Sequence, residues 1–146
     1  MSAVHIVLGV ALVTVNLAAG ALGALRWWRA EPSRTFWPLL RTGQALVVVE
    51  AVQGGVLLAL GEELPRLHLI YGLLPLGVSF VAEQLRIASA DSVLHGRGLE
   101  SSREVAALPE PEQRAIVLDI VRREMGVMAA SALVVVVLGL RAAALI

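Results

Sequence analysis

Long hydrophobic stretches alternate with short polar ones along the chain. Four stretches consist mainly of alanine, valine, leucine, isoleucine and glycine, and they cover about 3–24, 37–60, 67–85 and 126–146. Each is close to the roughly 20 apolar residues that a helix needs to cross a bilayer. None has the one-sided apolar pattern of a helix in a soluble bundle. The pattern therefore predicts four transmembrane helices in a single membrane domain.

Composition also indicates a membrane protein. Of the 146 residues, 58% are hydrophobic and 16% are charged, whereas soluble domains have about 45–50% and about 25%. A chain of this length has too little interior to bury the excess, so much of it must face lipid or a partner. The 12 basic residues, all arginine, balance 12 acidic ones, so the net charge does not suggest nucleic acid as a partner. The chain has no cysteine, which excludes disulfides and thiolate metal sites.

One polar segment, about 89–124, is long enough to form structure between the third and fourth spans. The third span is expected to continue as helix to the glycines at 96 and 98. The run LPEPEQRAIVLDIVRREMG, residues 108–126, has the prolines and acids that begin a helix, followed by apolar residues on one face. We expect a cytoplasmic connector helix here, or an amphipathic helix at the membrane surface. The predicted fold is an all-α integral membrane protein, a bundle of four transmembrane helices.

Arginines between the spans predict the orientation of the chain. Four arginines lie in the first loop and six lie between the third and fourth spans, whereas the second loop, GEELPR, has one arginine and two glutamates. Arginine is enriched on the cytoplasmic side, so both termini are expected outside the cytoplasm of a bacterial-type inner membrane. Since the basic residues follow the first span, we expect a retained anchor rather than a signal peptide. Four aromatic residues fit the cytoplasmic interface: Trp27, Trp28, Phe36 and Trp37.

Glu50 is a carboxyl about ten residues from either end of its span, hence near the predicted bilayer centre. An ionised carboxylate is costly in hydrocarbon, so Glu50 should face the bundle and either find a donor or stay protonated. At 100° per residue Gln53 shares its face, while Arg41 points to the other side. The fourth span has only Ser131 in its middle and is expected to face lipid or a partner. Further polar side chains of the first and third spans could complete a seam with Glu50: Asn16, Tyr71 and His68.

Three functional hypotheses follow from these residues. In the first, Glu50, Gln53, Asn16, Tyr71 and His68 form the ligand or proton site of a small proton-coupled transporter or ligand-binding membrane protein. In the second, the chain is a redox protein that binds b-type haem or quinone near the outer leaflet, because His5 and His68 open two spans on the same side and could be axial ligands. In the third, the polar groups only join helices of a non-catalytic accessory subunit.

No catalytic motif is present in the sequence, so an enzyme is the less favoured class. The chain has no phosphate-binding glycine loop, no HExxH and no GxSxG. Four short helices shield few polar groups, and we therefore expect a homo-oligomer or a subunit of a larger membrane complex. The lipid bilayer is the partner that the composition requires.

Overall fold

The computed structural model describes residues 3–144, and every element within this range is a helix. The four long helices are α1 (Ala3–Trp28), α2 (Phe36–Ala59), α3 (Arg66–Gly96) and α5 (Glu110–Ala143), and the short α4 (Ser102–Ala107) lies between α3 and α5. All four long helices are long and apolar enough to cross a membrane. The prediction of an all-helical chain with four helices able to span a membrane is confirmed.

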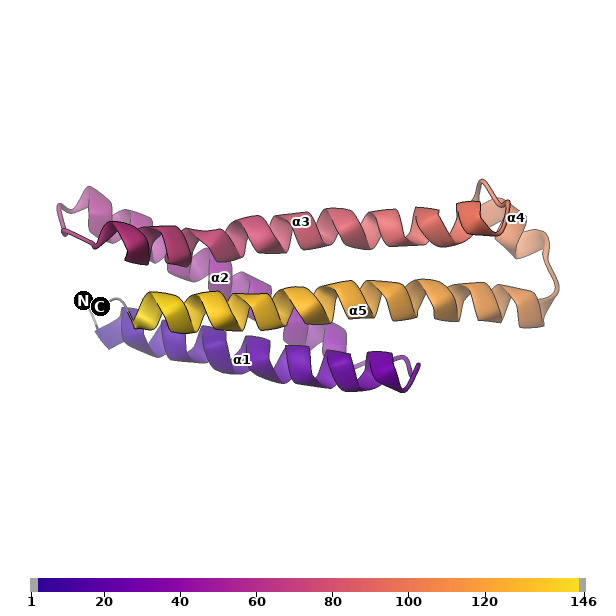
Figure 1. The fold of residues 1–146 in the computed structure, drawn as a ribbon, viewed down its shortest axis with the longest axis horizontal. Helices are drawn as coiled ribbons and strands as arrows, with labels where there is room; N and C mark the ends of the chain where they lie inside the picture. The colour runs from indigo at the N-terminus through magenta and orange to yellow at the C-terminus, as the bar shows by residue number, and fades with distance from the viewer. Residues whose placement is uncertain (1–2, 145–146) are drawn as a thin grey trace.

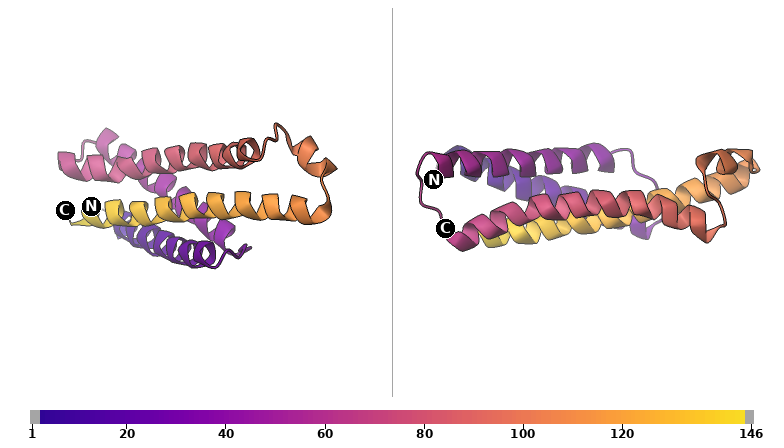
Figure 2. Two further views of the ribbon diagram at one scale, coloured as in Figure 1. Left: turned by 45° about the vertical axis from the view of Figure 1, so that its right-hand side comes forward. Right: turned by 90° about the horizontal axis from the view of Figure 1, so that it is seen from above.

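The long helices lie side by side in a bundle (Figure 1). α5 lies between α1 and α3, and α2 lies on the far side of α5, where it crosses the bundle obliquely (Figures 1 and 2). Both chain ends and the α2–α3 loop lie at one end of the bundle, which we call the N/C end. The other end carries the α1–α2 loop and α4, and we call it the α4 end.

α3 and α5 extend past the other helices at the α4 end as a helical hairpin (Figure 2). α5 has 34 residues, so at 1.5 Å per residue it is about 51 Å long, against a hydrocarbon core of about 30 Å. The hairpin therefore reaches well beyond the thickness of a bilayer.

The segment between the third and fourth spans contains no separate amphipathic helix within the described residues. The predicted connector, 89–124, is divided among three helices: it covers the last turns of α3, the whole of α4 and the first half of α5. α3 ends at Gly96, with Gly98 at a φ of 70°, and α5 begins with Glu110 and Pro111, as the sequence predicts. Ile116 in the first half of α5 is only 2% exposed. Protein therefore covers Ile116, whereas Val117 and Leu118 of the same segment are exposed.

α5 is the most buried of the four spans, whereas the sequence predicted a span that faces lipid or a partner; it keeps such a face only on one side, at Val134 and Val137. In its most apolar stretch 39% of the residues are buried, against 11% in α2. Small residues explain the difference. A Cβ added at Gly23 of α1 would lie 2.8 Å from the Cβ of Ala129 on α5, and one added at Gly20 would lie 2.6 Å from the Leu133 side chain. Such close approach decides which helices pack in lipid, where apolar surface alone gives no drive for association.

Phe36 belongs to the core of the bundle and not to the interface that the sequence predicts. Its side chain is fully buried in a cluster with Leu40, Met125 and Ala129. Trp28, in contrast, is 76% exposed. Phe36 stands in the first turn of α2, where the ring fills the space beside the α1 glycines, and this anchors the start of α2 to α1 and α5.

Substitution of Gly23 by alanine tests the close approach of α1 and α5. The new Cβ would lie 2.4 Å from Cε2 of Phe36 and 2.8 Å from Ala129, so we expect a loss of about 1–3 kcal/mol, the usual cost of overpacking. Thermal unfolding in one detergent measures it. The matched control is Gly77→Ala in α3, where nothing lies within 4 Å of the added Cβ, and where alanine should be neutral or stabilising. Equal stability of the two variants would contradict the packing described here.

Candidate functional site

Three titratable side chains meet near the N/C end of the bundle. His5 Nδ1 of α1 lies 2.7 Å from Glu50 Oε2 of α2. The His5 and His68 rings are 5.9 Å apart in an edge-to-face arrangement. Nδ1 of His68, on α3, lies 3.1 Å from the carbonyl oxygen of Ala142 on α5. We call His5, Glu50 and His68, from three of the long helices, the histidine–glutamate cluster; α5 contributes the carbonyl of Ala142 that contacts His68.

The side chains of the histidine–glutamate cluster are mostly buried. His5 and Glu50 expose 15% and 11% of their side chains, and His68 is 8% exposed. Because a carbonyl oxygen can only accept, the contact with Ala142 requires a hydrogen on Nδ1 of His68, which leaves Nε2 as the acceptor in the neutral ring. The cluster thus offers an imidazole, a carboxyl and a second imidazole in a region of low solvent access.

One oxygen of the Glu50 carboxyl has no donor. Oε1 is buried and has no hydrogen-bond partner among residues 3–144. A Cβ added at Gly9 of α1 would lie 3.8 Å from this oxygen, so Oε1 faces a helix surface that carries no side chain. A buried acceptor without a partner costs about 1–3 kcal/mol. A bound cation or a hydrogen-bond donor beside Oε1 would remove that cost.

Glu50 lies nearer the N/C end than its place along α2 suggests. Its carboxyl meets residues from the first turns of α1 and α3. The rest of α2, to Ala59, extends about 14 Å further, because α2 crosses the bundle obliquely and ends beyond the start of α1 (Figure 1). The tilt of α2 thus brings the Glu50 carboxyl to the N/C end of the bundle, beside the first turns of α1 and α3.

The other residues of the predicted seam do not all join the cluster. Asn16 is buried elsewhere, where its Nδ2 donates to the carbonyl oxygens of Leu12 and Gly43 at 2.9 and 3.3 Å. The ring of Tyr71 lies 5.8 Å from the Arg141 guanidinium, one turn beyond His68. Gln53 lies one turn beyond Glu50 on the same face of α2. The predicted seam therefore divides into the histidine–glutamate cluster with its neighbours and a separate contact where α1 crosses α2.

The histidine pair does not fit the haem hypothesis. Two axial ligands would each point a ring nitrogen at an iron between them. Here the edge of one ring is directed at the face of the other, with centroids 5.9 Å apart, which leaves no slot for a porphyrin. Among residues 3–144, no group of three or more His, Cys, Asp and Glu side chains could hold a metal ion either.

A second polar group, near the α4 end, was not recognised from the sequence. Gln44 Nε2 of α2 and Arg86 Nε of α3 each donate to the carboxylate of Glu83 at 2.9 Å. Arg41 of α2 forms an ion pair with the same carboxylate. Arg86 also lies 3.7 Å from Glu124 Oε1 of α5. We call these five residues the arginine–glutamate network, and it joins α2 to α3 and α5.

The sequence does contain a signal for this network. Arg41 points away from Glu50, as predicted, and a charged side chain within a span requires a partner on another helix. Glu83 and Arg86, three residues apart, form an ion pair along α3. Helical periodicity assigns each residue to a face of its own helix, but it does not show which helix covers that face.

The two polar groups lie in separate layers of the bundle. His68 and Glu83 are 15 residues apart on α3, or about 22 Å along the helix. Between the layers lies an apolar cluster from α1, α2 and α5, formed by Leu12, Val47 and Val135. These apolar side chains separate the two layers where α1, α2 and α5 meet.

Substitution of Glu83 by glutamine tests the arginine–glutamate network. It removes the charge that pairs Arg41 and Arg86, and we expect a loss of about 1.5–3 kcal/mol, typical of hydrogen bonds to charged groups. The control is Glu110→Gln, whose exposed ion pair with Arg114 lies outside the bundle core and should contribute little. Urea or thermal unfolding in detergent compares the two. A Glu83→Gln variant as stable as the control would show that the network does not hold α2.

Comparison with protein-family models, with curated protein sequences and with solved structures finds no significant match to this chain. Its function is therefore argued from the geometry of the site.

Proposed function

We propose that the chain is a small proton-coupled membrane transporter whose proton and ligand site is the histidine–glutamate cluster. The observation that carries the proposal is the 2.7 Å contact between His5 Nδ1 and Glu50 Oε2, formed between two side chains that are 15% and 11% exposed. Histidine is the side chain whose unperturbed charge changes near neutral pH. An ionisable residue within a membrane bundle is also more often functional than structural.

The chemistry of the pair supports competition between a proton and a cation. With one proton, His5 and Glu50 together have no net charge, whether the proton is on the imidazole or on the carboxyl. Loss of that proton leaves a net negative charge in a poorly hydrated site, which is costly unless a cation replaces the proton. A ligand that binds only the deprotonated cluster must displace the proton. Ligand binding then lowers the affinity for the proton, and proton binding lowers the affinity for the ligand by the same factor. This is the thermodynamic basis of proton coupling.

Other titratable and charged groups around the pair set its local charge. His68 of α3 lies beside His5, and Tyr71 follows one turn later. Arg141 of α5 lies over the Tyr71 ring and places a positive charge at the same end of the bundle. A small cation, or a ligand with one cationic group, is the class that suits the carboxyl with its unpartnered Oε1.

The layered arrangement supports a carrier rather than an open channel. The apolar cluster of Leu12, Val47 and Val135 separates the histidine–glutamate cluster from the arginine–glutamate network, so passage would require helices to move. α2 is the least buried of the four spans and contributes Glu50. Movement of α2 would therefore change the site at the lowest cost in packing.

The pH dependence of stability tests the proposal. At alkaline pH the folded cluster should still hold one proton, whereas the solvated side chains of the unfolded chain have released theirs. The folded state then binds more protons, so the free energy of unfolding should fall as pH rises toward 9. The slope is at most about 1.4 kcal/mol per pH unit for one proton. Glu50→Gln keeps the shape and requires no proton, so its profile should be flatter. Thermal unfolding in detergent from about pH 5 to 9 measures both, since this window would contain the titration of a buried carboxyl.

The matched control is Glu62→Gln, an exposed carboxyl in the α2–α3 loop at the same end of the bundle. Its pH profile should follow that of the parent. Identical profiles for the parent and Glu50→Gln, with no stabilisation of either by sodium or tetramethylammonium at pH 9, would overturn the transporter proposal. That result would favour an accessory subunit in which these contacts only join helices.

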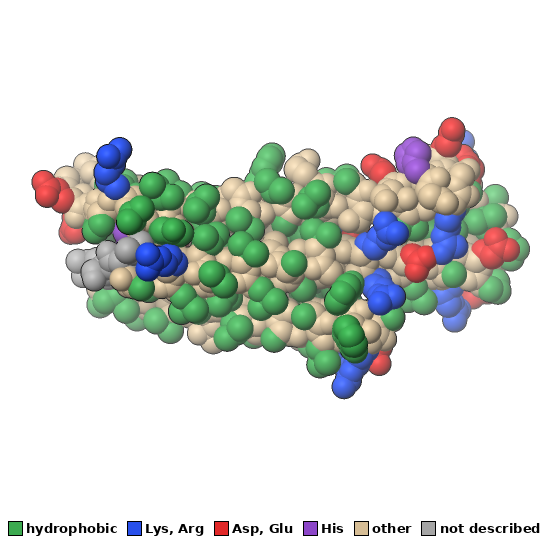
Figure 3. All heavy atoms as spheres, in the orientation of Figure 1, with side chains coloured by type: hydrophobic (Ala, Val, Ile, Leu, Met, Phe, Trp, Pro, Cys, Tyr) green, Lys and Arg blue, Asp and Glu red, His purple; other side chains and the backbone are tan. Residues whose placement is uncertain are grey.

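We also propose that the α4 end is cytoplasmic and that the chain ends are outside. Arginine side chains gather toward the α4 end on the face shown in Figure 3, and such residues are enriched on the cytoplasmic side. A cysteine in place of Glu62 should react with an impermeant thiol reagent in intact cells. A cysteine in place of Ser102, exposed at the start of α4, should react only after lysis. Labelling of the Ser102 variant in intact cells would reverse the orientation.

A further inference from the structure

A groove runs along α5 between α1 and α3, on the face opposite α2. Its volume is about 660 Å³, and its lining includes Trp27 of α1, Ser89 of α3, and Arg123, Gly126 and Ala130 of α5. The groove forms over Gly126 and Ala130 because their small side chains leave space above α5. The groove opens to the side of the bundle and is apolar except at its α4 end.

The exposed face of α5 has an arginine at each end and apolar residues between. Arg123, Ala130, Val134, Val137 and Arg141 recur at intervals of three, four and seven residues, and all five are exposed. Arg123 and Arg141 are 18 residues apart, or about 27 Å, close to the thickness of the hydrocarbon core. Arg123 therefore lies at the level of the lipid headgroups when Val134 lies near the bilayer centre.

The α4 end of the groove has positive charge without a balancing carboxylate. Three acids at this end of the bundle form ion pairs with other arginines: Glu31 with Arg26, Asp119 with Arg97, and Glu124 with Arg86. In the described part of the chain neither Arg122 nor Arg123 has a carboxylate within 4 Å. Arg123, the arginine that lines the groove, donates from Nη1 to Ser92 Oγ at 3.1 Å. Arg122 lines a neighbouring cavity beside Glu31, where its Nε donates to the carbonyl oxygen of Trp27 at 3.3 Å and its guanidinium lies 5.9 Å from the Trp27 ring.

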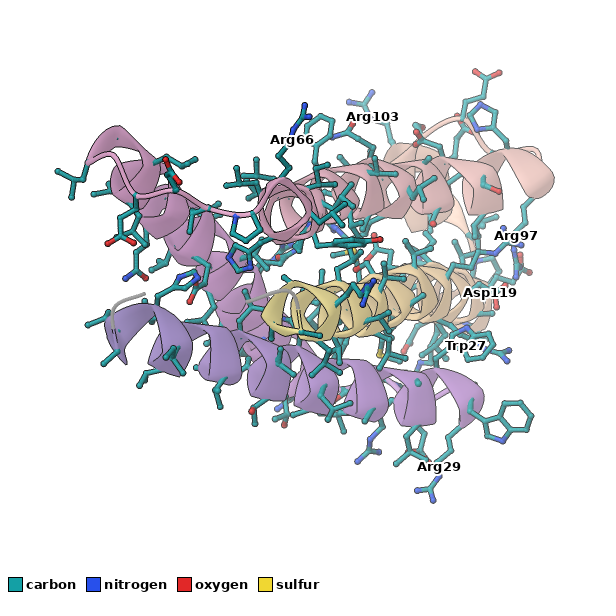
Figure 4. The ribbon with its side chains drawn as sticks, turned by 60° about the vertical axis from the view of Figure 1, so that its left-hand side comes forward. Trp27, Arg29, Arg66, Arg97, Arg103 and Asp119 are labelled. Atoms are coloured by element: carbon teal, nitrogen blue, oxygen red, sulfur yellow. The ribbon has the colours of Figure 1, made fainter. Side chains whose placement is uncertain are left out.

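Trp27 forms the α1 wall of the groove and closes it at the headgroup level. A Cβ added at Gly126 would lie 2.7 Å from the indole Nε1, so the absence of a side chain at Gly126 lets the ring lie on α5. Figure 4 shows Trp27 between α1 and α5, whereas Arg29 projects from the other side of α1. Tryptophan and arginine together at this depth are typical of a membrane interface.

We propose that this groove binds one phospholipid with an anionic headgroup. The phosphate would lie against Arg123, and an acyl chain would follow Ala130 toward Val134. The distance from Arg123 to Val134 is about 16 Å, half of the hydrocarbon core, which suits a chain from one leaflet. Basic pockets between transmembrane helices are sites of this kind.

The charge of the groove favours lipid over a second copy of the chain as its occupant. A parallel copy packed on the same face would bring its own Arg123 against this Arg123, and like charges in contact oppose association. An anionic lipid supplies the opposite charge together with an apolar chain that fits the small floor residues.

The experiment measures the thermal stability of the delipidated protein in a neutral detergent as phosphatidylglycerol is added. Phosphatidylcholine with the same acyl chains and sodium phosphate at the same concentration are parallel arms. Phosphatidylglycerol should stabilise the protein in a saturable way, and the other two should not. Arg123→Gln should weaken the apparent affinity about fivefold, the effect of one arginine at an anionic surface. Ala130→Leu, which fills the groove at an exposed position, should abolish the effect.

The matched control is Arg29→Gln, which removes an exposed arginine at the same end but outside the groove and should leave the affinity unchanged. Equal stabilisation by both lipids, an equal effect of sodium phosphate, or an unchanged response of Arg123→Gln would each overturn the proposal. So would a dimer, detected by light scattering, that Ala130→Leu dissociates while phosphatidylglycerol has no effect. These outcomes are independent of the pH profile of Glu50.

Discussion

A polar side chain inside a bilayer loses its water, and it is stable there only when the protein supplies a partner. In this bundle the partners lie on other helices. Glu50 of α2 meets an imidazole of α1, Asn16 of α1 meets a backbone carbonyl of α2, and Glu83 of α3 receives donors from α2. α2 buries little surface of its own, so these three polar contacts, at three levels, determine where it lies.

The other three long helices are placed by the size of their residues. α1 lies close against α5 because Gly20, Gly23 and Ala129 allow the two backbones to approach closely. The bundle therefore combines two modes of association. α5 carries many buried apolar residues and packs with α1 and α3. α2 is joined to this set by Phe36 at one end and by polar contacts along its length.

Features set by local sequence could be predicted, and features set by helix tilt could not. The four spans follow from runs of apolar residues, and the start of α5 follows from its prolines and acids around Glu110. The proximity of His5 and His68 was anticipated because both open a span on the same side. The depth of Glu50 and the partner of Asn16 depend instead on the oblique path of α2. Helical periodicity carries no information about that path.

The crossing of α1 and α2 gives α2 the geometry of a lever. One close contact between them is at Gly43, where an added Cβ would lie 2.7 Å from Asn16 Oδ1. Glu50 stands about 10 Å from this point along α2, and Ala59, before the α2–α3 loop, stands about 24 Å from it. A rotation that moves the Glu50 carboxyl by 1 Å would displace the end of α2 by more than twice as much. A change of charge at Glu50 that turned α2 about Gly43 would therefore move the α2–α3 loop further than the carboxyl itself.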